Sequence, residues 1–598
     1  IGGELCDNAG LIARPGFAIP PTRLLKLCRL SALYVTHLTQ SQTARGLQAE
    51  DAEVGHLINL SEGSAAYFTE LSLREQEFVG DTRRRQRRAS EALGEMRFET
   101  LKAASAGDAL TIIERKRRQY ARTKTKDPFG QPGNTRLIEA LQSADAFPHP
   151  AEHIDLVETH ISWVILTEDY AYKIKKPIVL EFLDFGTLER RKFFCDEELR
   201  LNQPYAPGIY LDVVPIVEDV GRPRFGGDGK AIEYALRMRR FDQELRLDRQ
   251  LETGKLTVED MRELGQVIAA RHAQAALVPA VRRKQQHATT RRFIHDNFTA
   301  LDGFADEQLL GRLAGWSRDQ LEELDAILWQ RFDDGMVRDC HGDLHLGNIV
   351  RLPDGIATFD CIEFDPELRE IDVFCDIAFL IMDLVSRERH DLASHFLNRY
   401  LERTGDYPGT AVLDLFFVYR CLVRAKVAAI SSREHAAGQA HDAAVADIDR
   451  YCRMAKRQIT KRPPLLILMH GLSGSGKTWL SDHLMARLPA IRIRSDVERK
   501  RLHGLDELEA SRSPIGGGIY DSATGEAVYS RLADLAELIL RHAHNVILDA
   551  AFLTAGQRAR ALDVAQRLGL RAVIVQIETP ETILRQRLEQ RAAAAQDA

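Results

Sequence analysis

Cysteine is scarce in this sequence, and its few copies are scattered. The chain has 8 cysteines in 598 residues, with no CxxC pair and no spacing typical of a zinc site. This distribution excludes a small disulfide-stapled scaffold and a structural zinc centre. We expect Cys340, Cys361 and Cys375 to be buried thiols in a reducing, cytoplasmic protein.

Long hydrophobic runs are also missing. No apolar stretch approaches about 18 residues, which argues against a membrane-spanning helix, and no Lys/Arg-led hydrophobic segment opens the chain. The net charge of −6 argues against a general affinity for nucleic acid. The length predicts three or four domains. Because the first residue is Ile1 rather than Met, we expect a fragment or a processed product.

One octapeptide, residues 471–478, matches the phosphate-binding pattern GxxxxGK[ST] at every fixed position. It follows an apolar, strand-like run at 465–469 and precedes a helix-like segment at 479–488, which is the context that the motif requires. Lys477 is expected to reach the β/γ-phosphates of ATP, and Thr478 to hold Mg²⁺. The residues expected to contact the nucleotide are Gly471, Ser473, Gly474, Ser475, Gly476, Lys477 and Thr478.

A second phosphotransfer signature, His-Gly-Asp-Leu-His-Leu-Gly-Asn, occupies residues 341–348. It resembles the catalytic loop of the aminoglycoside phosphotransferase and protein-kinase superfamily, in which Asn follows the catalytic Asp by five residues. Asp343 is then expected to orient the acceptor hydroxyl, and Asn348 to hold the metal. A hairpin over 349–360 places Asp360 as a further metal ligand, and Asp376 matches the family's buried brace better than Asp372 does.

The kinase resemblance extends upstream. Lys173, in Tyr-Ala-Tyr-Lys at 170–173, is expected to contact the α/β-phosphates, although Lys175 and Lys176 leave the register open. Its acidic partner should lie on a helix over 188–202, where Glu197 and Glu198 remain alternatives. We expect strands at 154–166, 210–217 and 233–238, and helices at 256–278, 291–301, 308–332, 372–399, 413–433 and 441–456.

The C-terminal segment carries further candidates. A strand over 491–495 is expected to end at Asp496, which would orient the acceptor, with Arg499 one turn later; Ser495 and Glu498 can alternatively form a capping box. A second strand ends at Asp549, a candidate for the Mg²⁺ shell.

Arg587 and Arg591 lie on an expected lid helix over 580–591, where a solvated helix face remains the alternative. The chain stops at Ala598, just past this segment, so we expect C-terminal residues to be missing. From residue 465 onward, 17 Lys and Arg face 16 Asp and Glu, which weighs against a polynucleotide substrate.

Residues 1–133 differ from the rest. They contain two basic runs, at 83–88 and 115–118, with no interleaved aromatic residues. Solvated faces or an unstructured extension are favoured over a polyanion-binding site, because single-stranded nucleic acids require aromatic stacking platforms. No function is assigned to this extension.

Residues 135–598 together resemble the bacterial bifunctional aminoglycoside phosphotransferase/ATP-binding proteins, and the C-terminal motifs are similar to those of polynucleotide-kinase-like and zeta-toxin-like proteins. The resemblance implies a two-lobed α+β kinase-like domain at 134–460. It also implies an α/β P-loop NTPase domain with a mainly parallel sheet at 461–598, after an uncertain, partly helical or disordered extension at 1–133. ATP and Mg²⁺ are the implied cofactors. Aminoglycosides do not follow as substrates, because a fold does not fix a function.

The sequence favours a bifunctional phosphotransferase that acts on small hydroxylated metabolites or nucleotides at two separate Mg-ATP sites. Two alternatives remain: a nucleotide-sensing regulator with one catalytic module, and a toxin-like P-loop kinase controlled by the kinase-like domain. The expected partner is a small-molecule or nucleotide phosphate acceptor, with no membrane contact and with nucleic acid disfavoured. The sequence leaves the oligomeric state open.

Overall fold

The computed structural model describes residues 132–159, 161–180, 183–219, 221–434, 439–460, 462–507, 509 and 518–593. The basic runs of the predicted N-terminal extension lie outside this part of the chain. The kinase-like and P-loop regions belong to one compact unit, residues 128–432 and 443–598. No helix in the described ranges combines the length and the apolar character needed to cross a bilayer.

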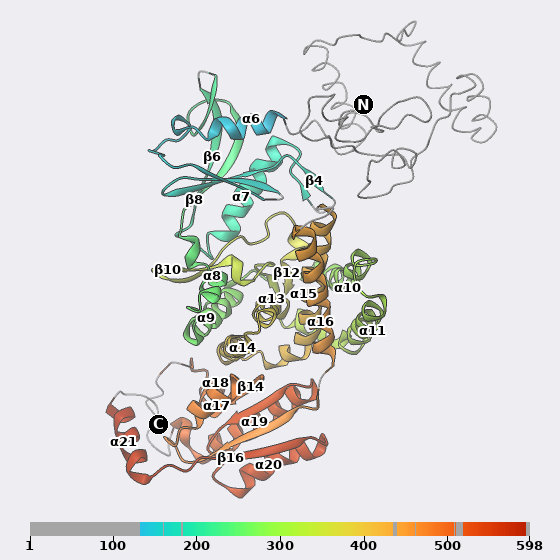
Figure 1. Ribbon diagram of the computed structural model, residues 1–598. Coiled ribbons are helices and arrows are strands. Elements are labelled where there is room, and N and C mark those ends of the chain that lie inside the picture. The colour runs from blue at the N-terminus through green and yellow to red at the C-terminus, as the bar shows by residue number, and fades with distance from the viewer. Residues whose placement is uncertain are drawn as a thin grey trace, which may run out of the picture. The chain divides into compact units, whose positions relative to one another are not determined.

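The N-terminal lobe of the kinase-like region is a six-stranded antiparallel sheet with α7 (Leu188–Asn202) packed against it (Figure 1). The helix bounds agree with the sequence prediction, and Thr187 caps the helix by accepting from the Arg190 N–H. In sheet order the strands are β1 (Asp155–Glu158), β2 (Ser162–Leu166), β3 (Tyr170–Lys175), β8 (Ala231–Arg239), β6 (Tyr210–Asp219) and β7 (Arg222–Phe225). Of these, β7 was not expected from the sequence.

The side chains of strand β3 alternate between the two faces of the sheet. Tyr172 and Ile174 point into an apolar core that contains Phe147 and Phe225. Because successive side chains of a strand point to opposite faces, Lys173 and Lys175 both point to the other face. Both lysines face Glu198 of α7, so the alternation does not by itself choose between them.

The C-terminal lobe is helical. Its helices are α8 (Leu247–Glu252), α9 (Val258–Gln274), α10 (Arg283–Ala300), α11 (Glu307–Glu323), α12 (Asp325–Asp333), α13 (Val373–Ser386), α14 (His390–Thr404), α15 (Thr410–Glu434) and α16 (Gln439–Ile459). Two predicted helices were wrong as continuous elements. The stretch over 308–332 divides at Leu324 into α11 and α12. The stretch over 372–399 divides near Glu388, whose φ of 59° is left-handed and cannot continue a helix.

The P-loop region is a four-stranded parallel sheet flanked by helices, as predicted (Figure 1). Its strand order is β14 (Ala490–Arg494), β15 (Asn545–Asp549), β13 (Leu465–His470) and β16 (Arg571–Gln576). Its helices are α17 (Lys477–Met485), α18 (Ser495–Leu502), α19 (Ser522–Arg541), α20 (Ala555–Arg567) and α21 (Glu581–Ala593).

The alternative capping box at the start of α18 does not form. The N-cap residue is Arg494, and no side chain caps the helix. Glu498 is buried and pairs with Arg501 and Arg531 instead. Asp496 therefore lies in the first turn of α18 rather than at the end of a strand.

Helix α14 of the kinase-like region packs on β14, the edge strand of the P-loop sheet. The Asn398 side chain donates to the Ala490 carbonyl at 2.9 Å and accepts from the Arg492 N–H at 2.6 Å. Glu402, one turn later, accepts from Arg492 Nη2 at 2.8 Å. All three side chains are buried, so the amide of Asn398 satisfies backbone groups that an edge strand would otherwise expose.

Glu402→Leu should destabilise the protein by about 1–3 kcal/mol, because it removes the more deeply buried of the two carboxylates, Glu402 and Asp482, that pair with the buried Arg492. Glu259→Leu is the matched control, since that exposed glutamate pairs with Arg262 at the surface and should cost less than about 1 kcal/mol. Urea unfolding followed by circular dichroism measures both. Equal shifts of the unfolding midpoint would contradict this interpretation of the interface.

Candidate active sites

Lys173 lies at the centre of the first candidate site. Its Nζ donates to Glu198 at 2.8 Å and to Asp360 at 2.6 Å, which joins β3, α7 and the loop after β11 (Gly355–Thr358). Burial alone would lower the pKa of Lys173, but Asp360 and Glu198 outweigh it and raise that pKa. Burial acts to raise the pKa of Glu198, yet the two lysines beside it lower that pKa to about 2.

Of the two glutamate candidates on α7, only Glu198 contacts Lys173. Glu197 faces the other way and pairs with Arg200 at 2.6 Å and Arg369 at 3.2 Å. Consecutive residues of a helix are about 100° apart, so one of them faces the sheet while its neighbour does not.

A second buried lysine belongs to the same cluster and was missed as a site residue. Lys175 Nζ donates to Glu198 at 2.7 Å and also to Glu363, and all three side chains are buried. The sequence signal that could have identified Lys175 is its i, i+2 spacing from Lys173, because residues two apart on a strand point to the same face. The result is an alternating cluster of two ammonium groups and three carboxylates, Asp360 included.

The catalytic loop brings Asp343 and Asn348 together. Asn348 Nδ2 donates to Asp343 Oδ2 at 2.9 Å and to the Asp343 carbonyl at 3.0 Å. Gly342 is required at its position, because its φ is 82° and a Cβ would lie 2.9 Å from the Leu368 carbonyl oxygen. The Asp360 N–H donates to the Tyr210 hydroxyl at 2.9 Å, which fixes the metal-site candidate from the N-lobe side.

Two oxygen donors remain for a divalent cation. The side-chain nitrogen of Asn348 donates to Asp343, so the side-chain oxygen of Asn348 takes no part in that hydrogen bond. The Asp360 carboxylate is 46% exposed. Carboxylate and carboxamide oxygens are the ligands that Mg²⁺ prefers. The donor set therefore fits Mg²⁺.

Basic side chains lie near the Asp343 carboxylate. Its Oδ2 lies 3.4 Å from His345 Nε2. Burial acts to raise the pKa of Asp343, but His345, His341 and Arg424 lower it well below its ordinary value. Asp343 is therefore an anion at neutral pH and can accept a hydrogen bond from a hydroxyl.

Asp376 braces the catalytic loop. Its Oδ1 accepts from the Gly342 N–H at 2.9 Å and its Oδ2 from the His341 N–H at 3.2 Å. His272 Nε2 lies 3.2 Å from the same Oδ2, and its Nδ1 lies 2.9 Å from the Tyr400 hydroxyl.

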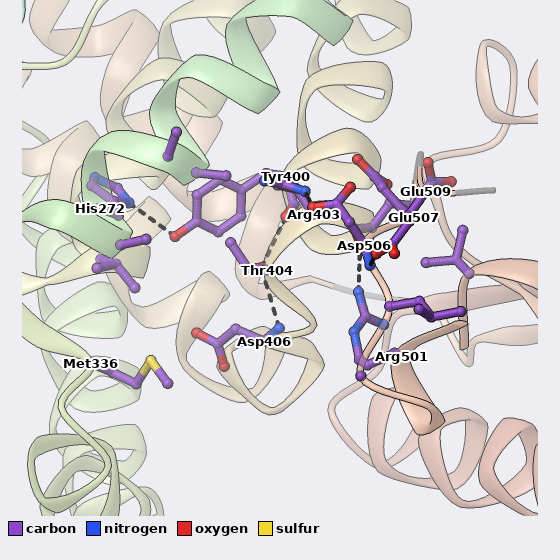
Figure 2. A pocket seen from close by; sticks show the side chains of 18 of the residues that line it. His272, Met336, Tyr400, Arg403, Thr404, Asp406, Arg501, Asp506, Glu507 and Glu509 are labelled. Atoms are coloured by element: carbon purple, nitrogen blue, oxygen red, sulfur yellow. Dashed lines mark hydrogen bonds and ion pairs between the residues drawn. The ribbon is translucent and has the colours of Figure 1, made fainter. Parts of the chain in front are cut away.

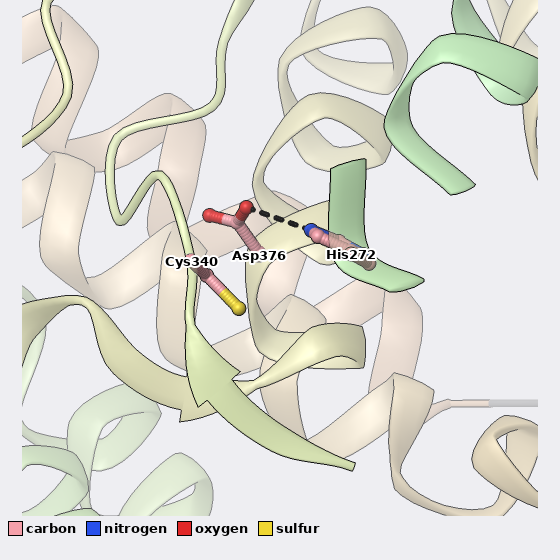
Figure 3. Close-up of side chains that lie close together, drawn as sticks. All are labelled: His272, Cys340 and Asp376. Atoms are coloured by element: carbon pink, nitrogen blue, oxygen red, sulfur yellow. Dashed lines mark hydrogen bonds and ion pairs between the residues drawn. The ribbon is translucent and has the colours of Figure 1, made fainter. Parts of the chain in front are cut away.

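Figure 3 shows His272, Cys340 and Asp376 converging as metal ligands might. Each ligand atom already has a hydrogen-bond partner, however, and the Cys340 thiol donates to the Ile371 carbonyl. Burial also raises the pKa of Cys340 well above its usual value, which disfavours the thiolate that a metal needs. The cluster is a hydrogen-bonded brace.

The P-loop forms the second candidate site. Gly471 has a φ of 153°, and a Cβ there would lie 2.8 Å from Ser475 Oγ and 2.9 Å from the Ile577 carbonyl. Lys477 Nζ donates to the carbonyls of Gly471 and Leu472 at 3.0 and 2.8 Å. Ser475 Oγ is buried with no hydrogen-bond partner among the described residues, as a group that awaits a phosphate would be.

Several expected residues border the P-loop. Arg587, on α21, donates to the Gly474 carbonyl at 2.9 Å. Arg591 lies on the same helix, but its side chain is outside the described part of the chain. Asp549 ends β15 and lies 3.3 Å from Ser481 Oγ on α17. With the Thr478 hydroxyl, its carboxylate forms a donor set that suits Mg²⁺.

Asp496 and Arg499 lie on α18. Asp496 is exposed, and Arg499 donates to the Ile519 carbonyl at 3.2 Å and covers the Tyr520 ring. The two residues are three positions apart in α18, so they lie on the same side of that helix. Their expected contact with an acceptor stays a prediction.

A cavity of about 630 Å³ lies between the kinase-like and P-loop regions (Figure 2). It is lined by His272 and Tyr400 on one side and by Asp506 and Glu507 on the other. Neither Asp343 nor Lys477 lines it. The cavity is therefore separate from both candidate sites, and two residues of its lining, Arg403 and Asp506, pair with each other.

Comparison with known families identifies parts of the chain. The model of the AAA domain matches residues 466–598, and that of the acetyltransferase (GNAT) domain matches residues 78–154. Most of the second match lies outside the described residues. Uncharacterized proteins of Mycobacterium tuberculosis and Mycobacterium bovis are each 30% identical over 461 residues, which is 76% of this chain and 90% of theirs.

Solved structures give weaker likenesses. A choline/ethanolamine kinase family protein from Mesorhizobium loti is 12% identical, with a TM-score of 0.36, over 59% of this chain and 98% of its own. An amicoumacin kinase in complex with AMP-PNP, Ca²⁺ and its antibiotic is 13% identical, with a TM-score of 0.35, over 55% and 94%. These TM-scores are low, and the two-lobed fold rests on the strand order and the element contacts of this chain.

Asp376→Asn should loosen the catalytic loop. The two carboxylate oxygens of Asp376 accept from the backbone N–H groups of His341 and Gly342, whereas an Asn side chain has one oxygen and would face the second N–H group with its own NH₂ group. We expect amide hydrogen exchange over residues 340–348 to accelerate about 10- to 100-fold, as a lost buried hydrogen bond would cause. Asp449→Asn, at an exposed position on α16, is the control. Unchanged exchange in Asp376→Asn would contradict the role of this carboxylate.

Proposed function

The chain belongs to the bacterial family in which an aminoglycoside-phosphotransferase-like kinase domain is fused to a P-loop kinase-like domain, and on this premise we propose that it is a bifunctional ATP-dependent phosphotransferase. The chain is a kinase of unidentified substrate. Each region is proposed to bind one Mg-ATP. The acceptors are proposed to be small hydroxylated metabolites or nucleotides.

One observation carries the proposal for the kinase-like region. Lys173 contacts Glu198 and Asp360 at the same time, while Asn348 holds the Asp343 carboxylate. A phosphotransfer site of this kind works mainly by positioning and by electrostatic stabilisation. These three contacts would provide both, since two of them position the phosphate-binding lysine and the third positions the carboxylate that orients the acceptor.

The proposed reaction transfers the γ-phosphoryl group of ATP to a hydroxyl. Asp343 accepts the hydroxyl proton in a hydrogen bond, the acceptor oxygen bonds to the γ-phosphorus, and the bond from that phosphorus to the bridging oxygen of ADP breaks. The proton passes through Asp343 to water. Lys173 holds the α/β-phosphates, and Asn348 and Asp360 would hold Mg²⁺, which neutralises phosphate charge when bound.

For the P-loop region, Lys477 and the loop amides are proposed to hold the phosphates, with Thr478 and Asp549 as Mg²⁺ ligands. The position of Arg587 on the Gly474 carbonyl supports a role for α21 as a lid. Asp496 and Arg499 are proposed to orient the acceptor of this site.

A second function, in which the P-loop region senses nucleotide and only the kinase-like region does chemistry, draws support from the buried α14–β14 contact. Arg492, which bonds to Glu402 at 2.8 Å, also bonds to Ser481 at 3.2 Å beside Asp549. A conformational change at the P-loop would therefore be transmitted to α14 through Ser481, Arg492 and Glu402.

We predict that the wild-type chain binds two Mg-AMP-PNP molecules and that Lys477→Ala binds one. The two sites share no side chain, so the loss of the P-loop lysine should leave the Lys173 site intact. Isothermal titration calorimetry gives the stoichiometry, and Lys500→Ala, on α18, is a control that should retain two sites. A single site in the wild type, or none in Lys477→Ala, would be incompatible with two nucleotide sites.

Asp343→Asn should lower phosphotransfer by the kinase-like region about 10²- to 10⁴-fold, which is the usual contribution of a positioned acid–base group. Nucleotide affinity should stay within a few-fold, because Lys173, Asn348 and Asp360 remain. Transfer from labelled ATP to an identified acceptor measures the rate. Turnover within tenfold of the wild type would remove Asp343 from the mechanism.

A further inference from the structure

Arg424, on α15, is a charged side chain near the kinase-like site that the proposed nucleotide, metal and proton-transfer contacts do not use. Its Nε donates to the Tyr451 hydroxyl at 3.4 Å, and the guanidinium lies 5.8 Å from the Tyr451 ring. Within the described residues, neither of its terminal nitrogens has an acceptor, and no carboxylate lies within ion-pair distance. Neither terminal nitrogen is fully buried, so both are open to solvent and can pair with an anionic ligand.

The packing of α15 places this side chain beside the catalytic loop. Arg420, one turn earlier, donates to the Cys375 carbonyl on α13 at 3.0 Å, and its guanidinium lies 4.6 Å from the Phe379 ring. Phe379 in turn contacts the His345 ring edge to face at 5.6 Å. Residues four apart lie on the same face of a helix, so Arg424 continues this face next to His345 and Asp343.

The charges agree with this placement. Asp343 and Asp383 are the two carboxylates that interact electrostatically with Arg424. Asp383 is occupied, because it accepts from the Leu346 N–H at 3.0 Å and pairs with Arg387 at 3.3 Å. This side of Asp343 therefore presents a free cation rather than free carboxylates.

We propose that Arg424 binds an anionic oxygen group, a phosphate or a carboxylate, on the hydroxyl-bearing acceptor of the kinase-like site. The guanidinium offers donors in a planar fork that matches such a group. This inference rests on the proposed function of that site. It assigns the acceptor to anionic hydroxy compounds and excludes polycationic aminoglycosides, whose amines would meet Arg424 where a pocket for them needs carboxylates.

The test uses the full chain with Lys477→Ala, which removes the P-loop site, saturated with Mg-AMP-PNP to fill the remaining nucleotide site. Inorganic phosphate and acetate are titrated separately, and their affinities are taken from ³¹P and ¹³C NMR line widths. The two arms distinguish a phosphate from a carboxylate as the preferred group. Arg424→Ala is compared with Arg424→Lys and with Arg453→Ala, an exposed arginine of α16 that pairs only with Asp449 in the described structure.

Arg424→Ala should weaken binding of the preferred anion about tenfold or more, as the loss of charge-assisted hydrogen bonds does. Arg424→Lys should retain part of the affinity, and Arg453→Ala should stay within twofold. Anion binding that Arg424→Ala leaves unchanged, or no binding at all while AMP-PNP binds, would overturn this inference alone. Failure of AMP-PNP to bind would instead refute the proposed function.

Discussion

The catalytic loop depends on one buried carboxylate. Asp376 accepts the backbone N–H groups of His341 and Gly342, and so determines where Asp343 points. A buried carboxylate is stable only when it is fully hydrogen bonded. His272 meets that need and is itself held by Tyr400, on α14. The geometry of the proposed phosphotransfer site therefore depends on α14, through Tyr400 and His272.

The same helix supports the second candidate site. Two residues after Tyr400, Glu402 pairs with Arg492, which bonds to Ser481 beside Asp549 of the P-loop region. Within the described chain, α14 is thus anchored to the loop that presents Asp343 and to the strand end that presents Asp549. Because these are buried polar contacts, leaving one member unpaired costs more than losing a surface ion pair.

Local patterns predicted much of this architecture. Hydrophobic periodicity predicted the bounds of α7, and the P-loop motif with its flanking strands predicted the parallel sheet. The order of kinase-like motifs along the chain predicted that Lys173, Asp343, Asn348 and Asp360 belong to one site. Periodicity could not choose Glu198 over Glu197, because the choice depends on which face of α7 packs on the sheet, against β8 and β6. Nor could it find the Glu402–Arg492 pair, whose members are 90 residues apart and carry no motif.

The central claim is that two regions of one chain transfer phosphate to different acceptors. The most direct test incubates the full chain with γ-labelled ATP, Mg²⁺ and a pool of small metabolites, and then separates the labelled products. The account predicts two classes of labelled product, one lost in Asp343→Asn and the other in Lys477→Ala. Release of labelled inorganic phosphate alone, with no labelled acceptor in any reaction, would contradict it.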